Sequence, residues 1–108
     1  MQIHHYTLAS QYQAQSEALF NEAYHIVEGG SPNIDQLERA AECISKSIER
    51  LSMAIHIYEN TFEADMYNKL IHNPMHKRTR LQGIILYNLD LMERVETSPC
   101  ISFLEHHA

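Results

Sequence analysis

Residues 34–58 read IDQLERAAECISKSIERLSMAIHIY and carry the most regular apolar pattern in the chain. Apolar side chains recur there in alternating steps of three and four residues, at Ile34, Leu37, Ala41, Ile44, Ile48, Leu51, Ile55 and Tyr58. This spacing keeps one face of a helix apolar over about 36 Å. It predicts a long helix that packs lengthwise in an intramolecular bundle, and the alternative is a homodimeric coiled coil.

The segments on either side also follow helical spacing. From about Leu8 to Glu28 the apolar residues recur as in an amphipathic helix. We expect that helix to stop at Gly29-Gly30, because glycine adopts the left-handed conformation without strain. Residues 62–70 form either a separate short helix or the first turns of a kinked one, and a last long helix runs from Met75 to about Glu96.

Composition limits the class of protein. The 108 residues suffice for a single domain, residues 1–108, and 3 glycines with 3 prolines are too few for an all-β fold. We therefore predict an all-α fold, an antiparallel three- to four-helix bundle. The net charge of −6 argues against a nucleic-acid partner, because phosphate contacts need a basic surface. Without a bilayer-spanning run or a signal peptide, we expect a cytoplasmic protein with no direct membrane insertion.

Side chains suited to metal binding or catalysis are scattered along the chain. Cys43 and Cys100 are expected to be free thiols, with a disulfide as the alternative. His72 and His76 are four residues apart, but Pro74 lies between them and no further ligands are close in sequence. We therefore expect no metal, no cofactor and no catalytic residue, so that the protein is not an enzyme.

One pair of residues favours a different interpretation. Arg50 and His56 resemble the Arg…His pair of the helical HEPN ribonucleases. On one regular helix, however, two side chains six residues apart point roughly 120° away from each other. A solvated arginine and a histidine on the flank of the helix explain the same residues.

The last predicted helix is apolar around an unusually wide arc of roughly 200°. Its apolar residues are Leu81, Ile84, Ile85, Tyr87, Leu89, Leu91, Met92 and Val95. A surface helix needs only about half of that arc to pack on one neighbour. We therefore expect this helix to contact two neighbours, or one neighbour and a bound ligand.

Small and apolar residues alternate in the second predicted helix at Ala40, Ala41, Ile44, Ile48, Leu51, Ser52 and Ala54. With the order of helix, glycine turn, helix, linker and long helix, this pattern resembles the MIT (microtubule interacting and trafficking) domain over about residues 8–96, leaving residues 97–108 as a tail. Residues 48–55 and 75–77 are most similar to the MIT domain of the autophagy-specific regulatory subunit of class III phosphatidylinositol 3-kinase complexes. Residues 61–73 are longer than the usual linker of that family.

The resemblance implies a non-enzymatic module that binds short helical motifs of trafficking or autophagy partners. A groove beside the last helix needs apolar residues outside the packed face, and the candidates are Ala54, Ile57, Ile84, Tyr87 and Leu91. The candidates for steering basic ligand residues are Glu49, Asp90 and Glu93. Alternatively, residues 62–70 or the tail cover this surface. The other functional hypotheses are a small self-associating helical protein, bacterial or viral, and a HEPN-like ribonuclease.

Overall fold

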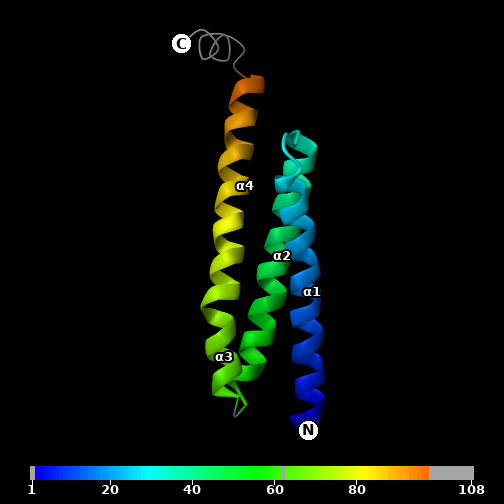
Figure 1. The fold of residues 1–108 in the computed structure, drawn as a ribbon, viewed down its shortest axis with the longest axis vertical. Coiled ribbons are helices and arrows are strands. Elements are labelled where there is room, and N and C mark those ends of the chain that lie inside the picture. Colours follow the sequence, from blue (N-terminus) through cyan, green and yellow to red (C-terminus); the bar gives the residue numbers. More distant parts are fainter. Residues whose placement is uncertain (1, 62, 98–108) are drawn as a thin grey trace.

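The structure is a computed structural model that describes residues 2–61 and 63–97, without the side chains of residues 2–4, 96 and 97. Four helices fill most of this range: α1 (Gln2–Glu28), α2 (Ile34–Glu59), α3 (Ala64–Ile71) and α4 (Asn73–Thr97), and no strand occurs within it (Figure 1). The all-α bundle predicted from the sequence is confirmed. α1 begins earlier than predicted, and α3 is a separate helix. Phe62, Cys100 and the predicted tail beyond Thr97 lie outside the described residues.

Local sequence explains where α2 begins and α1 ends. The Asn33 side-chain oxygen accepts a hydrogen bond from the Gln36 N–H at 2.8 Å, and Gln36 Oε1 accepts one from the Asn33 N–H at 2.9 Å. This reciprocal capping box satisfies two backbone donors at the start of α2. Gly30 has a φ of 109°, which residues with a Cβ rarely adopt. The predicted glycine stop after α1 is therefore confirmed.

Contacts between distant residues give the directions of the helices. Along α1 and α2 the contacts pass from Glu22–Arg39 through Ser16–Ser47 to Tyr6–Tyr58, so the two helices run in opposite directions. α4 runs opposite to α2, because Ile85 lies in a core cluster with Ile44 whereas Met75 packs near Tyr58. The colours of Figure 1 follow the same course.

α1 and α2 meet through small residues repeated every seven positions. On α1 these are Ala9, Ser16 and Ala23, and on α2 they are Ala40, Ser47 and Ala54; all six are completely buried. Ala23 and Ala40 share one core cluster and Ala9 and Ala54 the other, so the antiparallel pairing forms three layers. Small side chains let the two backbones approach closely. The approach is shown by Ser16 Oγ, which donates to the Ser47 carbonyl oxygen at 2.6 Å.

Larger side chains complete the core on both sides of these layers. Leu37, Ile44, Leu51 and Tyr58, every seventh residue of the predicted apolar face of α2, are at most 3% exposed. The other four residues of that face are half-buried: Ile34, Ala41, Ile48 and Ile55. Leu81 and Ile85 of α4 pack with Ile44 in the first half of α2, and Leu70 of α3 packs with Tyr58 near the other end.

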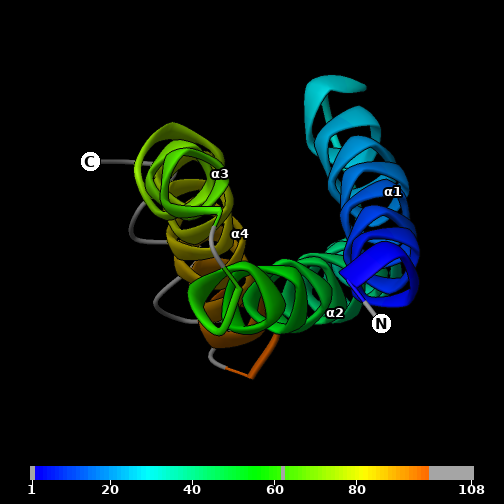
Figure 2. The ribbon, with the colours of Figure 1, turned by 90° about the horizontal axis from the view of Figure 1, so that it is seen from below.

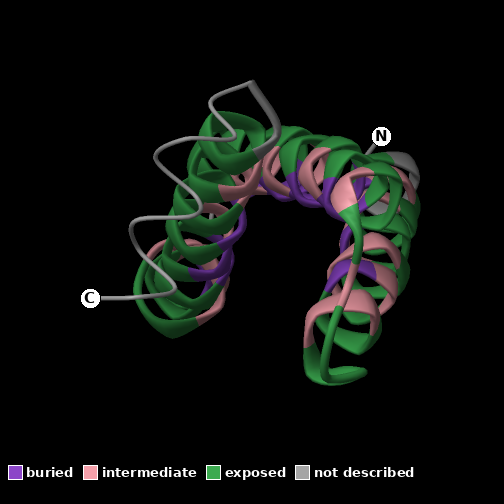
Figure 3. Ribbon diagram, turned by 90° about the horizontal axis from the view of Figure 1, so that it is seen from above, coloured by how far each residue is buried: buried purple, intermediate pink, exposed green. Residues whose placement is uncertain are grey.

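The helices form an open arrangement instead of a closed bundle. α1 and α4 both pack on α2 but contact each other very little. Viewed along the long axis, they diverge from α2 as two arms, and the buried residues lie on the inner side of the arch (Figures 2 and 3). In the described part of the chain, every helix is too short or too polar to cross a membrane.

Candidate functional site

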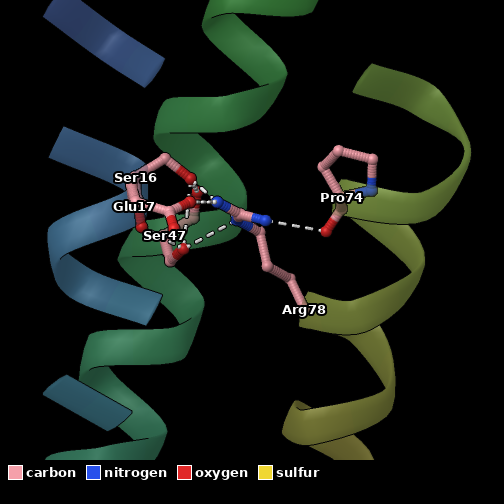
Figure 4. Close-up of polar contacts among 5 residues, drawn as sticks. All are labelled: Ser16, Glu17, Ser47, Pro74 and Arg78. Carbon is pink, nitrogen blue, oxygen red and sulfur yellow. Dashed lines mark hydrogen bonds and ion pairs between the residues drawn. The ribbon is translucent and has the colours of Figure 1, made fainter. Parts of the chain in front are cut away.

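The side chain of Arg78 on α4 reaches across to α1 and α2 (Figure 4). Its Nε donates to Ser16 Oγ at 2.9 Å and to Ser47 Oγ at 3.1 Å. Its Nη1 donates to the Pro74 carbonyl oxygen at 2.8 Å, and its Nη2 pairs with Glu17 Oε2 at 3.2 Å. We call these five residues the Arg78 cluster. It connects all three long helices.

The cluster buries a charged side chain between the three long helices. The Arg78 side chain is only 4% exposed, and its guanidinium carbon lies 5.0 Å from the centre of the Phe20 ring. Burial lowers the pKa of Arg78, and the Glu17 carboxylate opposes that shift. Within the described residues, no buried side-chain nitrogen or oxygen lacks a hydrogen-bond partner. The contacts of Arg78 with Ser16, Ser47 and Glu17 join α4 to α1 and α2, whereas its bond to the Pro74 carbonyl lies within α4. Because of the three contacts between helices, we assign the cluster a role in positioning α4.

A groove of about 550 Å³ lies beside the Arg78 cluster, between α1 and α4. Its lining residues are Phe20, Asn21 and Tyr24 from α1 and Lys77, Arg80, Leu81 and Ile84 from α4. Phe20 links the groove to the cluster, since its ring also lies 5.0 Å from the guanidinium carbon of Arg78. The floor of the groove is therefore held in place by the same contacts that position α4.

An exposed apolar stripe continues from this groove along α4. Ile84, Tyr87, Leu91 and Val95 follow one another in steps of three and four and are 44, 66, 39 and 36% exposed. Residues with this spacing share one face of a helix. The wide apolar arc predicted for this helix is thus divided in the structure: Leu81 and Ile85 are buried against neighbours, and this stripe is left exposed.

The groove residues predicted from the sequence lie at different places in the structure. Ala54 is completely buried in the α1–α2 interface and has no surface for a ligand. Glu49 and Ile57 line a different hollow, which α1 and α2 form together with Tyr12 and Met53.

The remaining predicted residues lie on α4. Ile84 lines the α1–α4 groove, and Tyr87 and Leu91 extend it. Asp90 forms an ion pair with Arg94 at 3.1 Å, one turn away on the same helix, and Glu93 is exposed. Neither Asp90 nor Glu93 lines the groove.

Of the seven residues that line the groove, only Ile84 is predicted from the sequence as a groove residue. The other six are Phe20, Asn21, Tyr24, Leu81, Lys77 and Arg80. A signal for the last two is present, because residues 77, 80 and 84 have helical spacing and so share a face with the apolar stripe. No comparable signal marks Phe20 and Tyr24. Their role depends on how far α4 stands from α1, which is a property of the tertiary fold.

The residues considered for metal binding and ribonuclease chemistry can also be placed. His72 and His76 line a shallow hollow where α3 meets α4, and no group of three metal-binding side chains occurs in the described residues. Arg50 Nη1 lies 3.7 Å from Glu49 Oε1, and His56 Nδ1 lies 3.5 Å from the side-chain nitrogen Nδ2 of Asn60. Arg50 and His56 belong to one continuous helix, α2, so the angular separation expected between them applies.

Comparisons with known proteins give no relative to which the site can be compared: no family model, curated protein or solved structure matches the chain. The groove and the stripe that continues it are therefore the features that bear on function.

Proposed function

We propose that this chain is a non-enzymatic protein-interaction module, of the MIT type, that binds a short helical segment of a partner in the groove between α1 and α4. The observation that carries the proposal is the exposed stripe Ile84, Tyr87, Leu91 and Val95, which continues directly from a groove with an apolar floor. Under the MIT interpretation, the partner is a trafficking or autophagy protein of the cytoplasm.

The open arrangement of the helices supports a helical ligand. In a four-helix bundle each helix packs against two neighbours. Here α1 and α4 pack on α2 but hardly on each other, which leaves the position opposite α2 without a helix among the described residues (Figure 2). A helix placed there would cover Phe20 and Tyr24 on one arm and Ile84 on the other. It would present apolar residues one turn apart, as amphipathic helices do in grooves.

Peptide binding tests the proposal. The probe is a fluorescein-labelled helical peptide of about four turns with leucine at every third or fourth position and glutamine elsewhere. We expect saturable binding by fluorescence anisotropy. Ile84→Ala and Tyr87→Ala should each weaken it by about fivefold or more, as truncation of anchor residues typically does.

Leu86→Ala is the matched control. Leu86 is 49% exposed, close to the 44% of Ile84, but it lies about 200° further around the same helix. Its truncation should leave both binding and the melting temperature unchanged. Absence of binding, or equal losses for Leu86→Ala and Ile84→Ala, would overturn the proposal. So would sedimentation of the unliganded chain as a dimer that Ile84→Ala dissociates, because the stripe would then serve self-association.

A further inference from the structure

The lysine and arginine side chains of this acidic chain differ in whether a carboxylate pairs with them. Five cationic side chains have carboxylate partners within 4 Å: Arg39 with Glu22, Lys46 with Glu42, Arg50 with Glu49, Arg78 with Glu17 and Arg94 with Asp90. Among the described residues, Lys69, Lys77 and Arg80 have no such partner. Two of these three, Lys77 and Arg80, line the α1–α4 groove.

The groove therefore combines an apolar floor with a basic edge. Its lining residues include Lys77 and Arg80 but no carboxylate. Glu17, about one turn before Asn21 on the facing helix, is already paired with Arg78 at 3.2 Å. Asn21 and Tyr24 add only uncharged polar atoms. A ligand that covers Ile84 accordingly meets two exposed cations toward the start of α4, Arg80 about one turn away and Lys77 about two turns away.

From this arrangement we infer that the helical segment bound in the groove is acidic along one edge, with Asp or Glu side chains that pair with Lys77 and Arg80. The inference rests on the proposed function and adds the charge of the partner. It reverses the expectation drawn from sequence, in which Glu49, Asp90 and Glu93 steer a basic ligand, because none of those three lines this groove. A basic segment would instead be repelled by two cations that no carboxylate neutralises.

Two labelled peptides with the same leucine positions test the inference, one with glutamate and one with lysine at the positions flanking the leucines. At low salt the full chain should bind the glutamate peptide more tightly, by roughly tenfold for two partly exposed ion pairs. Raising the salt to about 0.5 M should remove most of that difference, because exposed charges are screened. Lys77→Glu together with Arg80→Glu should reverse the preference.

Lys69→Glu is the matched control for Lys77→Glu. Lys69 is also an exposed cation without a carboxylate partner in the described residues, and its substitution changes the net charge equally, but it lies on α3 outside the groove. We expect Lys69→Glu to leave the glutamate preference unchanged.

The outcomes distinguish this inference from the proposed function. Equal binding of both peptides that is still weakened by Ile84→Ala would overturn the acidic preference and leave the proposed function standing. Tighter binding of the lysine peptide would do the same. If neither peptide binds, both proposals fail. A dimer in sedimentation that Lys77→Glu dissociates would show that a second copy occupies the groove, and this inference would be wrong.

Discussion

Replacement of Arg78 by alanine should separate α4 from the rest of the protein without destroying the α1–α2 pair. Arg78 is 4% exposed, and its guanidinium bonds Ser16, Ser47, Pro74 and Glu17. The serines have a second set of bonds that does not need Arg78: Ser16 Oγ donates to the Ser47 carbonyl oxygen at 2.6 Å, and Ser47 Oγ donates to the Ser16 carbonyl oxygen at 2.7 Å. The variant therefore loses the arginine contacts but buries no unsatisfied hydroxyl.

The expected cost follows from these contacts. Removing one partner of a buried charged network typically destabilises by about 3–5 kcal/mol. Because both hydroxyls stay paired and Glu17 is well exposed, we expect Arg78→Ala to lie at the lower end, at about 3 kcal/mol. Arg78→Met keeps most of the buried stem against Phe20, and apolar replacements of buried charges are often nearly neutral. We expect it to cost about 1 kcal/mol or less.

Urea denaturation followed by far-ultraviolet circular dichroism measures both variants against the wild type. A loss of about 3 kcal/mol is a large share of the roughly 5–15 kcal/mol that stabilises a domain, so the midpoint should move clearly. Hydrogen exchange should accelerate in α4 more than at the α1–α2 interface. A cost below about 1 kcal/mol for Arg78→Ala, or equal destabilisation by Arg78→Met and Arg78→Ala, would contradict the role assigned to Arg78.

Three further predictions concern single side chains. Leu51 is 1% exposed, so Leu51→Asp should leave the chain unfolded at 25 °C by circular dichroism, and a cooperative melt near that of the wild type would contradict this. Burial raises the pKa of the Cys43 thiol, and neighbouring Glu22 adds to that shift. In a Cys100→Ser background, a disulfide reagent should therefore label Cys43 only as the protein unfolds. Fast labelling of the native state would contradict this prediction. The hydrogen bond from Arg39 lowers the pKa of Glu22 in the folded state, so this pair stabilises the fold above the ordinary glutamate pKa, and the stabilisation is lost as the pH falls through the lowered value. Glu22→Gln should therefore make the urea midpoint depend less steeply on pH on the acid side. An unchanged slope would show that the pair contributes nothing.

The sequence predicts the helices well because their pattern is local. Steps of three and four from Ile34 to Tyr58 place Leu37, Ile44 and Leu51 on one face, and the structure buries them. The small residues of the α1–α2 interface are not predicted in this way, because the pattern is recognised from large apolar side chains and not from alanine and serine. Ala54 lies outside the regular apolar steps of α2 and is therefore predicted as a groove residue, although the structure buries it with Ala9 between α1 and α2.

The site is less predictable because it depends on contacts between distant segments. Arg78 belongs to a basic stretch, residues 76–80, that looks like a solvated helix surface. In the structure it is buried and bonds Ser16, which lies 62 positions earlier in the chain. The basic edge of the groove is also hard to predict, because it depends on which cations form ion pairs with carboxylates in the folded chain. Lys77 and Arg80 differ from Arg94 in this respect, since only Arg94 has an aspartate one turn away on its own helix.

The repeat of small residues between α1 and α2 has a consequence for how the two helices align. Ala9, Ser16 and Ala23 recur at the same interval as Ala40, Ser47 and Ala54, so sliding one helix by seven residues would again place small side chains opposite one another. Such a displaced alignment would set a serine against an alanine and remove the paired hydroxyls that receive Arg78 Nε. The central serine layer thus distinguishes the native alignment from its nearest competitors, much as a single buried polar residue fixes the alignment of a coiled coil.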